Sequence, residues 1–97
     1  MITVRQTVAF ADWFGELGDR KAQATIAKRI VRLESGLPGD VRAVGDGVME
    51  ARIHFGPGYR LYYVQRGAEL IVLLCGGDKS TQDRDIARAN RLAAGLD

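Results

Sequence analysis

The sequence is poor in the residues that build disulfide frameworks and metal sites. It contains one cysteine, Cys75, and one histidine, His54. A single cysteine excludes an intrachain disulfide and a cysteine-cluster zinc site, and nothing in the spacing of the acidic residues brings metal ligands to His54. A GxxxxGKS/T phosphate loop, an HExxH helix and a nucleophile elbow are also missing. We therefore expect a protein without cofactor or metal.

Long apolar runs are absent as well. The longest, Leu70–Cys75, is far shorter than the roughly 20 residues that cross a bilayer, and the first ten residues lack the hydrophobic stretch of a secretory signal. The 97 residues, 46% apolar and 27% charged, suit one folded domain spanning 1–97. The net charge of +2 neither requires nor excludes a polyanionic partner. We expect a cytoplasmic protein with a reduced thiol and no membrane contact.

The first half of the chain predicts one short strand and two helices. Residues Ile2–Gln6 alternate between apolar and polar, which is typical of a strand. Thr7 is a suitable N-cap, and the helix after it places an aromatic and leucine stripe on one side before Gly18, formed by Phe10, Trp13, Phe14 and Leu17. Asp19 caps a second helix, which reaches about Ser35 and carries many basic residues. Those basic residues favour a solvated face over a binding surface.

The second half changes from helical to strand periodicity. The pattern predicts an antiparallel meander followed by a helix that ends at Gly95, its strands being Val48–Phe55, Tyr59–Gln65 and Glu69–Cys75. The run from Ser80 to Asp83 matches a capping box and predicts the start of that last helix. The resulting order is a strand, a two-helix hairpin, a three-stranded meander and a helix, which is an α+β fold.

A polar cluster on the meander carries the candidate chemistry. Side chains two residues apart share a strand face, so Arg52 and His54 lie together, and alternation places Arg60 and Tyr62 on the same outer face. Lys79, at the end of the central strand, reaches the same rim. Fixed cations beside a proton carrier suit phosphodiester cleavage, and RNA supplies its own 2′-hydroxyl nucleophile. The alternative reading is a solvated face, with the arginines paired to acids and His54 at the surface.

The segment from Val48 to Ala89 resembles the RelE/ParE superfamily of bacterial toxins, and within it the HigB-like addiction-module killer proteins. The strings that carry this resemblance are EARIHFGPGYR (50–60) and LLCGGDKSTQ (73–82). The resemblance implies a RelE-like fold and an endoribonuclease that cuts mRNA in the ribosomal A site by attack of the 2′-hydroxyl. Position by position, it implies Arg52, Arg60 and Lys79 as catalytic residues, with His54 added. It implies Arg52, Tyr62 and Lys79 as the residues that contact the substrate.

The same resemblance implies partners and a rival function. An antitoxin neutralises such a toxin; in this branch it is usually a helix-turn-helix DNA-binding protein, so the toxin meets DNA only through it. The ParE branch shares the fold and inhibits DNA gyrase without cutting RNA. The sequence departs from the family pattern at two places. Glu50 replaces a lysine of the meander strand, and Asp85 and Ile86 stand where some members carry a catalytic tyrosine. The identity of the general base is therefore open between His54 and Tyr62.

Overall fold

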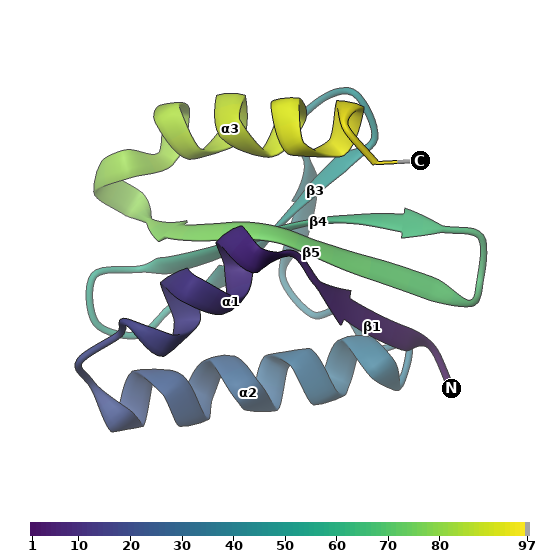
Figure 1. The fold of residues 1–97 in the computed structure, drawn as a ribbon. Helices are drawn as coiled ribbons and strands as arrows, with labels where there is room; N and C mark the ends of the chain where they lie inside the picture. The colour runs from purple at the N-terminus through teal and green to yellow at the C-terminus, as the bar shows by residue number, and fades with distance from the viewer. Residues whose placement is uncertain (97) are drawn as a thin grey trace.

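Helices cover both faces of a five-stranded mixed sheet in the computed structural model, which describes residues 1–96 (Figure 1). In chain order the elements are β1 (Thr3–Gln6), α1 (Val8–Gly15), α2 (Arg20–Glu34), β2 (Val41–Ala43), β3 (Val48–Ile53), β4 (Tyr59–Arg66), β5 (Leu70–Asp78), the 3-10 turn η1 (Lys79–Thr81) and α3 (Gln82–Ala94). The strand order is β1-β5-β4-β3-β2, and only the β1–β5 pair is parallel. The predicted α+β fold is confirmed, and the arrangement is that of a RelE-like fold.

The two N-terminal helices begin at the predicted caps. The Thr7 hydroxyl accepts a hydrogen bond from the Phe10 amide at 3.0 Å, and the Asp19 carboxylate accepts one from the Lys21 amide at 2.9 Å. Each cap satisfies an amide that the first helical turn leaves without a partner. Both helices pack on the face of the sheet opposite α3, and α2 lies below the sheet in Figure 1.

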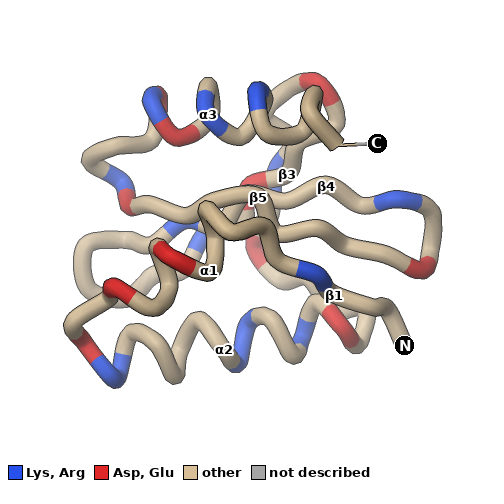
Figure 2. Tube along the Cα trace, viewed as in Figure 1, with Lys and Arg blue, Asp and Glu red and all other residues tan. Residues whose placement is uncertain are grey.

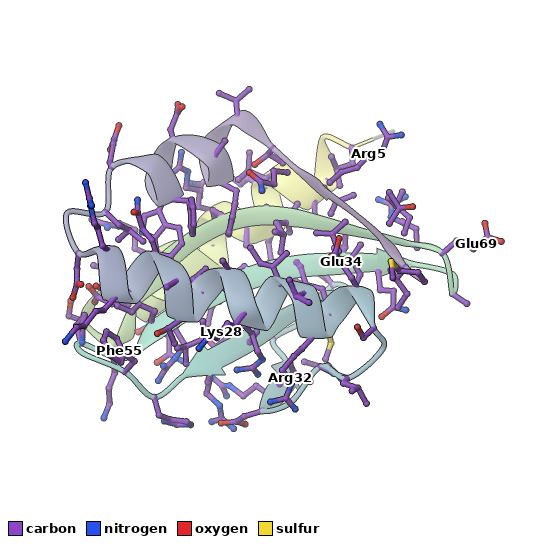
Figure 3. The ribbon with its side chains drawn as sticks, turned by 90° about the horizontal axis from the view of Figure 1, so that it is seen from below. Arg5, Lys28, Arg32, Glu34, Phe55 and Glu69 are labelled. Atoms are coloured by element: carbon purple, nitrogen blue, oxygen red, sulfur yellow. The ribbon has the colours of Figure 1, made fainter. Side chains whose placement is uncertain are left out.

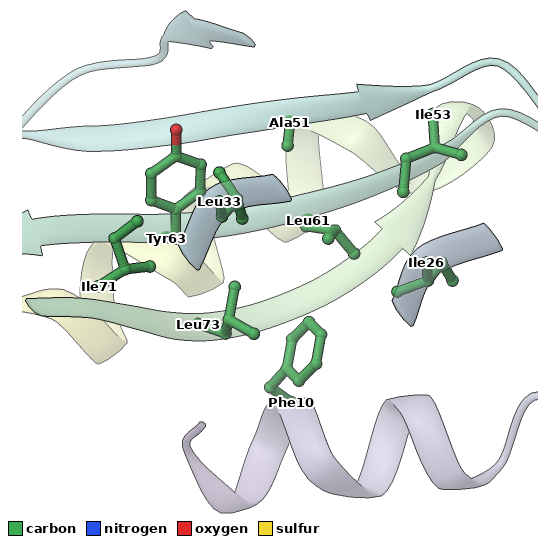
Figure 4. Packing of buried hydrophobic residues seen from close by; sticks show 9 residues of the cluster. All are labelled: Phe10, Ile26, Leu33, Ala51, Ile53, Leu61, Tyr63, Ile71 and Leu73. Carbon is green, nitrogen blue, oxygen red and sulfur yellow. The ribbon is translucent and has the colours of Figure 1, made fainter. Parts of the chain in front are cut away.

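The larger core lies between these helices and the sheet. Phe10 of α1 and Leu33 of α2 belong to one buried cluster with Leu73 of β5, and the members of this cluster are drawn in Figure 4. Trp13, Phe14 and Leu17 pack around it with part of their surface exposed. The predicted aromatic stripe is therefore the contact surface of α1 with the sheet.

A second core lies beneath α3, on the opposite side of the sheet. Tyr62, Leu74 and Ala89 belong to it, and each has 0% of its surface exposed. The outer face of the meander is therefore not open along its whole length. The expectation that Tyr62 lies exposed beside Arg52 and His54 is wrong, because α3 covers this part of the face.

Strand β5 continues through two glycines to Asp78, three residues beyond the predicted end at Cys75. A β-carbon on Gly76 would overlap the ring of Trp13 in α1, and one on Gly77 would overlap the carboxylate of Asp85 in α3. Successive side chains of a strand point to opposite faces. The glycine pair thus lets a helix approach the strand closely from each side.

Two further local predictions are corrected, and one strand was not predicted. The predicted capping box at Ser80 is wrong: the box starts at Asp78, which caps η1 and accepts a hydrogen bond from the Ser80 amide at 2.8 Å, whereas α3 begins at Gln82 after Thr81 without a side-chain cap. Strand β3 ends at Ile53, so His54 lies just beyond it. Strand β2, which was not predicted, pairs antiparallel with β3 and extends the sheet. No helix within residues 1–96 has the length and apolar character needed to span a bilayer.

Candidate functional site

Two arginines stand directly opposite each other on neighbouring strands. Arg52 of β3 and Arg60 of β4 are paired in the antiparallel register, and Arg60 is in turn paired with Gly77 of β5. Paired residues project to the same face of a sheet, where like charges normally repel each other. An anion or a counter-charge is therefore favoured beside this pair.

The guanidinium of Arg60 lies beside Gly58 and Lys79. Its Nη1 donates hydrogen bonds to the carbonyls of Gly58, at 3.0 Å, and Tyr59, at 3.2 Å. A β-carbon on Gly58 would stand 3.4 Å from both Arg60 Nη1 and Lys79 Cβ, so both cationic residues lie next to this glycine. Arg60 is only 7% exposed, whereas Lys79 is exposed.

Neither of these two cations is neutralised within residues 1–96. The ion pairs in this part of the chain involve Arg42, Arg52, His54 and Arg84, and none includes Arg60 or Lys79. We call Arg60 and Lys79 the phosphate spot. A guanidinium held by two backbone carbonyls near an exposed lysine, without a carboxylate partner, is suited to binding a phosphate group.

Arg52 and His54 turn instead toward Asp40, the residue before β2. Arg52 Nη2 donates to Asp40 Oδ1 at 2.8 Å, and His54 Nε2 lies 2.7 Å from Asp40 Oδ2. The hydrogen bond with His54, and then that with Arg52, lowers the pKa of Asp40. The imidazole remains open to solvent, with 73% of the side chain exposed. The structure therefore divides the predicted cluster into the phosphate spot and an Asp40-centred group, joined by the Arg52–Arg60 pair.

Arg29 of α2 fixes the backbone around Asp40. Its guanidinium donates three hydrogen bonds of 2.7 Å, to the carbonyl oxygens of Pro38, Asp40 and Arg52. Partial burial lowers the pKa of Arg29. One side chain thus ties α2, the loop before β2 and strand β3 together.

Tyr62 and Glu50 form a buried polar network under α3. The Tyr62 hydroxyl donates to Glu50 at 2.9 Å, and Gln82 and Arg42 also donate to this carboxylate, each at 2.8 Å. Burial alone would raise the pKa of Glu50, but the three hydrogen bonds outweigh it and the net shift is downward. Burial and Glu50 both raise the pKa of the Tyr62 phenol. Tyr62 is therefore a structural residue without access to substrate, and His54 is the more accessible proton carrier.

A basic groove of about 400 Å³ runs between α2 and the end of β3. Lys28 and Arg32 of α2 line it, together with Phe55, and all three are labelled in Figure 3. Arg29, Asp40, Arg52 and His54 line it too, so Asp40 is its one acidic residue. Figure 2 shows that the basic positions of α2 and those of α3 lie on opposite sides of the sheet. The groove leads away from the Asp40-centred group along α2.

Sequence reasoning missed Asp40 and Arg29. Asp40 follows Pro38 and Gly39, a context typical of a turn, and Arg29 is one of several basic residues on its helix. The only local signal is the positive φ of Gly39, +75°, which the sequence does not reveal. As for metals, no three His, Cys, Asp or Glu side chains gather as ligands within residues 1–96.

Comparison with known proteins assigns a family to this arrangement. Residues 12–93 match the family described as phage derived protein Gp49-like. A protein of Haemophilus influenzae, described as uncharacterized, is 46% identical over 95 residues, which cover 98% of this chain and 96% of the relative. The solution structure of the conserved hypothetical protein HP0894 from Helicobacter pylori is similar in fold, with a TM-score of 0.56, 23% identity, and coverage of 82% of this chain and 97% of that one.

Proposed function

Since the chain belongs to the phage-derived Gp49-like family, a RelE-like family associated with the toxins of toxin–antitoxin systems, we propose that it is such a toxin and cuts mRNA on the ribosome. Within the family we assign it to the HigB-like type. The observation that supports cleavage is the phosphate spot, where Arg60 and Lys79 both lie next to Gly58 without a carboxylate partner among residues 1–96.

The proposed reaction uses the nucleophile of the RNA itself. His54 accepts the proton of the 2′-hydroxyl, and the 2′-oxygen forms a bond to phosphorus. The bond from phosphorus to the 5′-oxygen breaks, and water protonates the departing oxygen. The products are a 2′,3′-cyclic phosphate and a 5′-hydroxyl. Arg60 and Lys79 stabilise the extra negative charge on phosphorus, the kind of contribution that lowers a barrier most.

The ribosome supplies what the small chain lacks. A net charge of +2 is modest for binding free RNA. A message already held in the ribosomal A site presents its phosphate in a fixed position, and this positioning replaces intrinsic affinity. An antitoxin partner, as the family implies, neutralises the toxin between periods of activity.

In vitro translation with the purified protein, followed by primer extension on the message, tests the proposal. New 5′ ends should appear with the wild type, and their amount should fall on the order of a hundredfold or more with Lys79→Ala. Because Lys79 is exposed, its loss leaves the fold intact. The Arg60→Ala/Lys79→Ala double variant should abolish cleavage, and Arg88→Ala/Arg91→Ala, on the exposed side of α3, is the matched control.

Two outcomes contradict the proposal. Undiminished cutting by Arg60→Ala/Lys79→Ala removes the role of the phosphate spot. An intact message, together with blocked supercoiling and trapped cleavage complexes when the same preparation is added to DNA gyrase, identifies a ParE-like inhibitor instead.

A further inference from the structure

We propose that Asp40 is a positioning residue for His54, and that it presents Nδ1 of this ring to the RNA as the proton acceptor. This inference rests on the proposed function and names the part of the site that orients its general base.

The contact between the two side chains selects one form of the ring. An ionised carboxylate only accepts hydrogen bonds, so His54 Nε2, 2.7 Å from Asp40 Oδ2, carries the hydrogen. In the neutral ring the free electron pair is then on Nδ1. A base with its other nitrogen held by a carboxylate is fixed in both tautomer and orientation.

Asp40 is itself held through both its side chain and its backbone. Arg52 donates to Oδ1 at 2.8 Å, which leaves Oδ2 for His54. The backbone carbonyl of Asp40 accepts two hydrogen bonds, one from Arg29 Nη2 at 2.7 Å and one from the Arg52 amide at 2.9 Å. Both the backbone and the side chain of Asp40 are therefore fixed before substrate arrives.

Gly39 shows that the loop is built around Arg29. Its φ of +75° is a conformation that favours glycine, and a β-carbon there would lie only 3.1 Å from the Arg29 guanidinium. The backbone thus comes close enough for Arg29 to reach the carbonyls on either side of Gly39, those of Pro38 and Asp40. An incidental surface ion pair does not need such a support.

The single histidine permits a direct test that does not depend on activity. Nitrogen-15 shifts of the two ring nitrogens report the tautomer, and three-bond couplings across Cα–Cβ report the rotamer. In the wild type with a neutral ring, we expect the Nε2–H form and one rotamer. In Asp40→Asn we expect averaging between rotamers; a ring equally averaged in both proteins overturns the proposal.

Kinetics then separate Asp40 from its two partners. Asp40→Asn should lower the cleavage rate about tenfold to a hundredfold, and Asp40→Glu should restore part of it. The double variant Asp40→Asn/His54→Gln should be no slower than His54→Gln alone, because Asp40 acts through His54. The proposal is overturned if the effects of Asp40→Asn and His54→Gln on the cleavage rate are fully additive in the double variant. It is also overturned if the effect of Asp40→Asn is non-additive only with that of Arg52→Gln.

The two proposals fail in different ways. If the wild type cuts no RNA, the proposed function fails and the role of Asp40 in cleavage fails with it. If the wild type cuts and Asp40→Asn cuts equally well, only the positioning role is lost.

Discussion

Trp13 of α1 lies directly over Gly76 of β5, with its ring in the space that a β-carbon would occupy. Gly76→Ala should therefore push α1 away from the sheet and destabilise the fold by about 2 kcal/mol, as overpacked cores do. For a chain of this length the melting temperature should fall by roughly 10 °C. Thermal unfolding followed by circular dichroism measures the shift.

The matched control for this change is Gly18→Ala. No atom lies within 4 Å of a β-carbon at Gly18, so its unfolding free energy should change by no more than about 0.5 kcal/mol. Equal melting temperatures for the two variants would contradict the close approach of Trp13.

Glu50→Gln should destabilise the protein in a pH-dependent way. The hydrogen bonds from Arg42, Gln82 and Tyr62 lower the pKa of Glu50 despite its burial. Ionised Glu50 therefore stabilises the fold above the unfolded pKa of about 4.3, and this contribution is lost as the pH falls through the lower folded value. At pH 7 we expect a loss of about 1–3 kcal/mol.

Denaturant unfolding at pH 7 and pH 3 checks this prediction. The difference in unfolding free energy between the wild type and Glu50→Gln should shrink at the lower pH. Glu69→Gln, at the exposed turn between β4 and β5, should match the wild type at both values. If the difference in unfolding free energy between the wild type and Glu50→Gln grows at pH 3, the ionised form of Glu50 does not stabilise the fold and the prediction is refuted.

Reversing charge in the basic groove should weaken binding to ribosomes. Lys28→Glu/Arg32→Glu changes two exposed residues of the groove, and Arg88→Glu/Arg91→Glu makes the same change on α3. Both variants lower the net charge from +2 to −2. Only the groove variant should lose affinity, with a salt slope reduced by about one for each lost phosphate contact. Cosedimentation at several salt concentrations measures this, and equal losses would point to net charge alone.

Cys75 should be inert in the folded protein. Burial raises the pKa of its thiol to about 11, so at pH 8 only about one molecule in a thousand carries the reactive thiolate. A disulfide reagent such as dithionitrobenzoate should label the native chain very slowly and the chain in guanidinium at once. Rapid labelling of the native chain would show that the core under α3 opens.

Much of this fold was predictable from local patterns. The caps at Thr7 and Asp19 and the alternation along β3 and β4 are short-range signals, which the structure confirms. Strand β2 was not predictable, because three residues between glycine-rich turns are too short to show an alternating pattern. Gly76 and Gly77 resemble a turn in sequence, yet they are needed because Trp13 of α1, distant in the chain, and Asp85 of α3, soon after them, pack closely on the strand.

The candidate site was predictable only in part. The antiparallel register of β3 and β4 places Arg52 opposite Arg60, and the alternating pattern of the two strands predicts that they share a face. The covering of Tyr62 depends on where α3 packs, and the role of Asp40 depends on the pairing of β2 with β3. Both are tertiary contacts that no local pattern encodes.

The parallel pairing of β1 with β5 also bears on when the proposed toxin activity can arise during synthesis. The Thr7 hydroxyl donates to the Leu74 carbonyl across 67 positions of the chain, and such distant contacts form slowly. A nascent chain that has not yet released β5 has neither a partner for its first strand nor Lys79 beside Arg60. On the proposed function, the toxin therefore becomes active only after β5 and η1 have left the ribosome, which leaves time for an antitoxin to be present first.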